Sequence, residues 1–217
     1  MTTMTTMTTM TTHTMTTSFA KIISTLFHPL LVPTYALLML INLQTHSILA
    51  LPVNYRYTIV IIVFLTTFVL PSIFIFLLLK INKIHSLEMR SQHERVLPMI
   101  IITIAFYTTY YLLTQTSLTG LMALFMIGAT MLILVTLIIN YITKISLHMT
   151  AWGGLFGTFL GIAITFQYNL TLVLFIIIFL IGIIGAARLK LNAHTPLQIY
   201  CGFFLGTGVM LLLFYFI

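Results

Sequence analysis

Seven apolar segments, each long enough to cross a membrane, follow one another along the chain with short polar stretches between them. They lie at residues 27–43, 57–79, 98–113, 118–142, 150–165, 170–184 and 196–217. The pattern predicts an all-α, polytopic transmembrane helical bundle of six to seven spans. In the fifth segment, Gly153, Gly157 and Gly161 form small-xxx-small pairs, which favour close helix packing over a separate functional role.

The composition excludes a soluble protein, since 60% of the residues are hydrophobic and only 5% are charged. The net charge is +7, but the nine basic residues are spread over short loops and form no nucleic-acid surface. The single cysteine, Cys201, falls inside a predicted span, so neither a disulfide framework nor a cysteine metal site is expected.

Acidic residues are nearly absent: Glu88 and Glu94 are the only two, and the chain has no aspartate. Most chemistry that depends on carboxylates is thereby disfavoured, including proton-relay transport and carboxylate metal cages. We therefore expect no metal and no cofactor. A transporter is the weaker alternative, because no span carries an acidic residue at its middle.

The chain divides into two parts. Residues 1–20 are rich in Met and Thr, lack the charge and apolar core of a signal peptide, and are expected to be a disordered tail. Residues 21–217 are expected to form one transmembrane domain.

With seven spans, three loops lie on the same side of the membrane as the N-terminus, at residues 80–97, 143–150 and 186–198. Nearly all the basic residues and histidines outside the tail fall in these loops, whereas the opposite side has Arg56 and His46. Scattered basic residues would not converge on one face in three separate loops. This convergence predicts a functional site.

The third loop carries the clearest local pattern. Arg188 precedes His194 by six residues, and Thr195, Pro196 and Gln198 form the Thr-x-x-Gln start of a helix. A helix N-terminus attracts anions, and an arginine can bind phosphate oxygens with two nitrogens. The stretch therefore predicts a phosphate site, with an ordinary solvated loop as the alternative.

The three loops together resemble the type-2 phosphatidic acid phosphatase superfamily, whose motifs are Lys-x6-Arg-Pro, Pro-Ser-Gly-His and Ser-Arg-x5-His-x3-Asp. Arg188 and His194 match the third motif with its five-residue gap. Ser146 and His148 match the second, and Arg95 matches the first, with a proline three residues later. The resemblance runs from about residue 57 to the C-terminus.

The resemblance implies a membrane enzyme that hydrolyses a phosphate monoester or diphosphate headgroup, of the phosphatidate, prenyl diphosphate or lipid A type, without a metal. It implies that His194 is the nucleophile and forms a phosphohistidine, and that His148 is the general acid. The residues implied to bind phosphate are Arg95, Arg188, Ser146, Lys144 and Arg90. The implied partners are a phosphorylated lipid substrate and membrane lipids, and homo-oligomer formation is left open.

The chain also departs from these motifs. Gln198 stands where the family has the aspartate that orients the nucleophile, and Glu88 stands at the lysine position. Gln198 is expected to bond either the Thr195 N–H or the His194 ring, not both well; Glu94 is the other candidate to orient His194. These departures leave a second function open, a non-catalytic membrane binding or assembly subunit.

The expected location is the bacterial cell membrane, and its sidedness is left open. The excess of basic residues on the motif side favours the cytoplasm, whereas the resemblance favours the outer face. His28 and His46, near span ends, are expected to lie at the interface without a role in the site.

Overall fold

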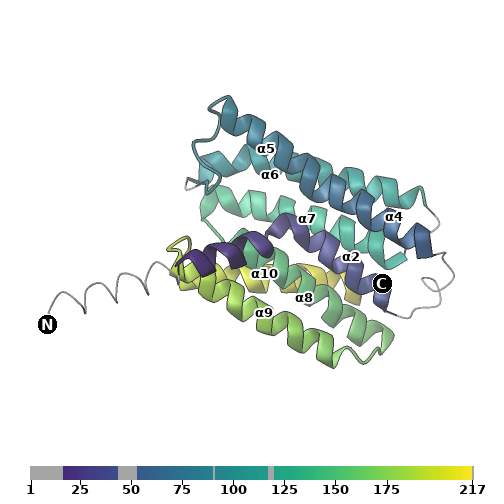
Figure 1. Ribbon diagram of the computed structural model, residues 1–217. Coiled ribbons are helices and arrows are strands. Elements are labelled where there is room, and N and C mark those ends of the chain that lie inside the picture. The colour runs from purple at the N-terminus through teal and green to yellow at the C-terminus, as the bar shows by residue number, and fades with distance from the viewer. Residues whose placement is uncertain (1–16, 44–52, 90, 117–119, 217) are drawn as a thin grey trace, which may run out of the picture.

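The computed structural model describes residues 17–43, 53–89, 91–116 and 120–216, which form helices joined by short loops and contain no strand. Seven of the helical segments are long and apolar enough to cross a membrane. The predicted all-α bundle is therefore confirmed, and its architecture is that of a multi-pass membrane protein. Figure 1 shows the spans lying roughly side by side as one bundle.

The first two spans are interrupted helices, and the other five are continuous. The first span, Thr17–Asn42, contains helical residues 17–26, a short 3-10 helix η1 (Pro29–Leu31) and α2 (Val32–Asn42). The second contains α4 (Val53–Phe64), a π-helical segment η2 (Leu65–Val69) and α5 (Leu70–Lys80). The remaining spans are α6 (Gln92–Thr114), α7 (Gly120–Ile142), α8 (Leu147–Phe166), α9 (Thr171–Lys190) and α10 (Pro196–Tyr215).

Prolines explain both interruptions. The ring of Pro29 removes a backbone N–H, and the His28 Nδ1 atom accepts a hydrogen bond from the Leu30 N–H at 3.3 Å to begin η1. In the second span, Pro71 lies two residues after the end of η2, where the wider π turn accommodates the missing donor. Both interruptions lie near the cavity described below.

The helices α8 and α10 form the closest pair in the bundle. A Cβ added at Gly153, Gly157 or Gly206 would collide with the backbone of Phe203, Thr207 or Thr150, respectively. The Thr207 hydroxyl donates to the Gly153 carbonyl at 3.1 Å across this contact. The small-xxx-small spacing in the fifth segment therefore marks helix packing, as expected.

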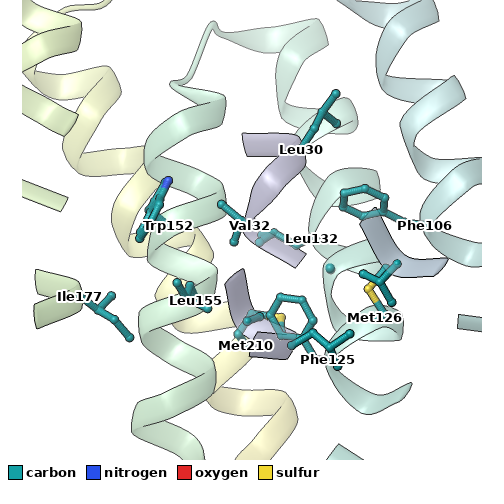
Figure 2. Packing of buried hydrophobic residues seen from close by; sticks show 14 of the residues in the cluster. Leu30, Val32, Phe106, Phe125, Met126, Leu132, Trp152, Leu155, Ile177 and Met210 are labelled. Atoms are coloured by element: carbon teal, nitrogen blue, oxygen red, sulfur yellow. The ribbon is translucent and has the colours of Figure 1, made fainter. Parts of the chain in front are cut away.

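The first span lies between the two halves of the bundle, and α2 contacts α4, α7 and α8 (Figure 1). Trp152 of α8 is buried against it, with its indole N–H donating to the Phe27 carbonyl at 3.1 Å. Figure 2 shows Trp152 beside Val32 of α2 in the apolar core. The span that the sequence motifs leave out is thus central to the packing.

The helices extend further than the sequence predicted. The first span begins at Thr17, so residues 17–20 of the expected tail are helical; residues 1–16 lie outside the described part of the chain. Arg95, His148 and Arg188 lie on the ends of α6, α8 and α9 instead of in loops. The reason for α6 is a cap: Ser91 Oγ accepts a hydrogen bond from the Glu94 N–H at 3.2 Å.

Candidate functional site

The three loops of interest gather at one end of the bundle, at the left in Figure 1, next to the start of the first span. At this end α6, α8 and α10 begin, and α9 ends. Three helix N-termini therefore place the positive ends of their dipoles in the same region. Arg188 and Lys190 lie in the last turn of α9, where a cation stabilises the negative end of the dipole.

A cavity of about 670 Å³ opens among these helix ends and continues into the bundle. Four of the predicted site residues line it: Arg95, His148, Arg188 and His194. They come from α6, α8, α9 and the loop before α10, and so from three separate regions of the sequence. The structure therefore brings together the arginines and histidines that the motif match singled out.

Arg95 is held in place by backbone carbonyl groups. Its side chain is only 5% exposed; Nε donates to the Met89 carbonyl at 3.0 Å and Nη1 to the Ile145 carbonyl at 3.2 Å. Met89 has a φ of 45°, a backbone conformation that is uncommon for a residue with a long side chain. Arg95 thus ties the loop before α6 to the loop before α8, and it carries a buried positive charge at the cavity.

The guanidinium group of Arg188 makes fewer hydrogen bonds to the protein than that of Arg95. Its Nη1 atom donates to the Ser24 hydroxyl at 3.3 Å, while its buried Nε atom has no hydrogen-bond partner among the described residues. Glu88 also lines the cavity and lies close enough to Arg188 to interact with its charge. A buried donor without a partner costs about 1–3 kcal/mol. An anion in the cavity would supply the missing acceptor.

The orientation of His194 depends on Gln198. The Gln198 Oε1 atom accepts from the Thr195 backbone N–H at 3.2 Å, and the same atom lies 3.1 Å from His194 Nδ1. The expectation that one geometry would not serve both groups is wrong, because an amide oxygen has two lone pairs. Since Oε1 accepts, Nδ1 carries the proton, and His194 Nε2 keeps its lone pair.

His194 is only 8% exposed, and its pKa is lowered from 6.5 to about 4. Burial is the largest cause, and the positive charges of Arg188, Arg95 and Lys144 act in the same direction. The hydrogen bond with Gln198 opposes them. At neutral pH the ring is therefore uncharged, as a nucleophilic imidazole requires.

His148 is oriented by the first span. Its Nε2 atom lies 3.0 Å from the Ser24 carbonyl oxygen, which only accepts, so Nε2 carries the proton. In the neutral ring Nδ1 then has the lone pair. Ser24 therefore contacts both Arg188, through its hydroxyl, and His148, through its carbonyl.

Ser24 and His28 are site residues that the sequence analysis missed. His28 lines the cavity with its ring 5.7 Å from that of His148 and 6.4 Å from that of Phe68, so its expected interfacial position was wrong. One signal was present: Ser24 and His28 are polar residues at the i, i+4 spacing typical of one helix face, directly before Pro29. In the structure Ser24 is helical, whereas His28 is the extended N-cap of η1. The family motifs contain no counterpart to this segment.

Three other predicted site residues, Ser146, Lys144 and Gln198, do not line the cavity. Ser146 is completely buried; its N–H donates to the Gln198 carbonyl at 3.3 Å, and its Oγ has no partner among the described residues. Lys144 is half-buried and close enough to His194 to influence its charge. Glu94 accepts from the His85 N–H at 3.2 Å, and Gln198 is the residue that bonds His194. Arg90 lies outside the described residues.

No group of three or more His, Cys, Asp or Glu side chains in the described part of the chain is arranged to hold a metal ion. The cavity is lined by the oriented imidazoles of His194 and His148, the guanidinium groups of Arg95 and Arg188, and also by His28 and Glu88. In comparisons with known proteins, no protein-family model, no curated protein and no solved structure matches this chain.

Proposed function

We propose that this protein is a metal-independent membrane phosphatase that hydrolyses a phosphorylated lipid headgroup through a phosphohistidine. One observation carries the proposal: His194 and His148, each with one ring nitrogen bonded to the protein, share a cavity with Arg95 and Arg188. Phosphoryl transfer depends mainly on positioning the reacting atoms and neutralising the phosphate oxygens. These four side chains are suited to both tasks.

In the first step, the lone pair of His194 Nε2 attacks phosphorus, and the bond from phosphorus to the lipid oxygen breaks. Arg188 and Arg95 bind the phosphate oxygens, and Arg188 Nε gains the acceptor that it lacks. His148 Nδ1 takes a proton from the phosphate monoanion of the substrate and gives it to the departing lipid oxygen, while Nε2–H stays bound to the Ser24 carbonyl. The positive charge that forms on His194 is offset by the bound phosphate and by the oxygen dipole of Gln198.

In the second step, water attacks the phosphohistidine. His148 is now neutral, and its Nδ1 lone pair takes the proton from the water molecule while Nε2–H stays bound to the Ser24 carbonyl. The proton passes from His148 Nδ1 to the inorganic phosphate, which leaves, and both imidazoles return to their neutral starting states. The location that we propose is a bacterial cell membrane.

The test is phosphate release by purified protein with EDTA present, with phosphatidate, a prenyl diphosphate and phosphorylated lipid A as substrates. We expect release from at least one substrate, inhibition by vanadate, and labelled phosphohistidine after quenching in alkaline denaturant. His194→Asn should abolish both release and labelling, and His148→Asn should slow release on the order of a hundredfold or more. His93→Asn is the matched control, because His93 is exposed on the first turn of α6.

A second function is favoured by Gln198. The partner of His194 Nδ1 is a neutral amide, which cannot balance an imidazolium charge as a carboxylate does. This favours a membrane binding or assembly subunit that retains a phosphate site without turnover. In that case lipid phosphate should raise the Tm and be recovered intact by mass spectrometry, whereas labelled phosphohistidine would exclude this function.

A further inference from the structure

The cavity has a polar end and an apolar end. Arg95, Arg188 and His194 lie at the end where the helices α6 and α10 begin. Phe106, Phe125 and Met210, all buried, line the opposite part. Figure 2 shows these three residues, which belong to α6, α7 and α10, within the apolar core. A ligand that fills this space must therefore be charged at one end and apolar at the other.

The depth of the cavity is measured along α6. Arg95 and Phe106 both line it and are eleven residues apart, which corresponds to about 16 Å at 1.5 Å per residue. This is roughly half of the apolar thickness of a membrane, about 30 Å. An apolar chain bound through its headgroup at Arg95 would thus reach toward the middle of the bundle.

The volume of the cavity limits how many hydrocarbon chains of a ligand it can hold. At about 30 Å³ for each water-sized group, 670 Å³ holds about 22 non-hydrogen atoms. A phosphate group uses five of them, which leaves space for one chain of roughly 17 atoms. Two acyl chains of ordinary length need about twice that number, so a two-chain phospholipid does not fit inside.

We infer that the cavity binds a single-chain phosphorylated amphiphile, such as an alkyl, monoacylglycerol or short prenyl phosphate, with its chain inside the helical bundle. The inference rests on the proposed function only for the position of the phosphate, at Arg95 and Arg188. The apolar part of the cavity then determines the number and length of the chains. The protein is selective for one chain of limited length.

Phe125 forms the floor that sets this length. It lines the main cavity and also a second, apolar void of about 10 Å³ that lies among the first span, α4, α6 and α7. Removing its ring would join the two spaces. Ala129, one helical turn away on α7, also lines the cavity, and a larger side chain there would shorten it.

The experiment measures the binding of alkylphosphonates of 6 to 20 carbons, which resist hydrolysis because the carbon–phosphorus bond is not cleaved. The protein is held in nanodiscs, and affinity is expressed against the free aqueous ligand concentration. Affinity should rise about fourfold per added methylene, and then stop rising when the chain fills the cavity. A phosphonate analogue of two-chain phosphatidate should bind at least about tenfold more weakly than the one-chain analogue of the same chain length.

Two variants should change the limiting chain length in opposite directions. Ala129→Leu adds three carbon atoms to the wall and should shorten the limiting chain by about three carbons. Phe125→Ala opens the floor and should lengthen the limit by several carbons. The series of chain lengths and the comparison of one-chain with two-chain analogues use the wild-type protein, so they remain informative even if a variant does not fold.

The inference is overturned if affinity rises without a limit, if the two-chain analogue binds as well as the one-chain analogue, or if no phosphonate binds. Hydrolysis is scored separately. A chain-length limit without phosphate release from any substrate would leave the inference standing and refute the proposed phosphatase. Phosphate release without a chain-length limit would do the reverse.

Discussion

Gln198 Oε1 links two functions of one short segment, because it accepts hydrogen bonds both from the Thr195 N–H and from His194 Nδ1. The backbone N–H is an unambiguous donor, so it fixes which end of the amide is oxygen. That oxygen in turn places the proton of His194 on Nδ1. The cap of α10 thereby determines the tautomer of the proposed nucleophile.

Gln198→Glu should raise turnover, because a carboxylate keeps both hydrogen bonds and also offsets the imidazolium charge that forms during phosphoryl transfer. Gln198→Ala should lower both turnover and Tm, because the capping bond is lost at a cost of about 1 kcal/mol. The measurements are kcat for phosphate release and the Tm of each purified variant. Thr195→Ala is the control: it weakens the cap, since Thr195 Oγ1 accepts from the Gln198 N–H, but leaves the bond to His194.

The control separates the two roles. If Thr195→Ala lowers kcat as much as Gln198→Ala at a similar Tm, Gln198 acts only through the cap. An active wild type whose kcat is unchanged by either Gln198 substitution would refute the orienting role.

The low pKa of His194 makes stability depend on pH. In the unfolded chain the imidazole has a pKa near 6.5, whereas burial and the charges of Arg188, Arg95 and Lys144 lower it to about 4 in the fold. The unfolded state therefore binds a proton more readily, and the contribution of the group, fully present above pH 6.5, is lost as the pH falls toward 4. Wild-type Tm should fall over this range.

His194→Gln removes the titrating ring, so its Tm should fall less between pH 7 and pH 4.5 than that of the wild type. The measurement is Trp152 fluorescence during heating in detergent. Because both proteins contain the other histidines, the difference between their Tm values excludes the pH dependence that those histidines cause. The same drop in Tm in both proteins would contradict the lowered pKa.

At the scale of the elements, the α8–α10 contact holds the two proposed catalytic histidines at a fixed distance. His148 lies in the first turn of α8, and His194 lies directly before the cap of α10. The missing side chain at Gly206 lets α10 approach Thr150 and Gly154 of α8 closely. Displacing these helices would therefore move one histidine relative to the other.

Gly206→Ala should lower the Tm and the rate of phosphate release, because its Cβ meets backbone atoms that cannot move independently. Overpacking of this kind costs typically about 1–3 kcal/mol. Gly208→Ala is the matched control: it lies on the same helix, and nothing is within 4 Å of its added Cβ. Both variants are compared by Tm in detergent and by kcat. Equal Tm values for the two would show that α8 and α10 are not held by this contact.

At the scale of the whole molecule, seven spans place the loops before α6, α8 and α10 on one side and the α8–α9 loop on the other. The basic residues collect on the first side: Lys21, Lys80, Lys83, Lys144 and Lys190 lie there together with the cavity arginines, against Arg56 on the other side. Positive charge in short loops favours the cytoplasm. We therefore expect the cavity to open toward the cytoplasm.

The test uses single cysteines in a Cys201→Ser background, in intact cells treated with a membrane-impermeant maleimide. Tyr168→Cys, in the loop between α8 and α9, should be labelled. Lys83→Cys, in the exposed loop before α6, should be labelled only after the cells are opened. The reverse pattern would place the cavity on the outer face, and labelling of both in intact cells would refute the seven-span arrangement.

The sequence by itself determined the helical class, the number of spans to within one and the side on which the polar residues gather, because long apolar segments have one stable arrangement in lipid. It also determined the cap of α10, since a capping box is a local interaction among Thr195, Pro196 and Gln198. The sequence also assigned Arg188 and His194 to one site, because they are only six positions apart in one segment.

Only the tertiary structure decided which polar residues share the cavity. Ser24 and His28 contact α8 and α9 residues that are more than a hundred positions away, and no local pattern specifies such a contact. The same holds for Ser146, which matches a motif but is buried beside α10 and does not line the cavity. Helix periodicity determines which face a residue occupies, whereas the packing of seven spans determines what that face meets.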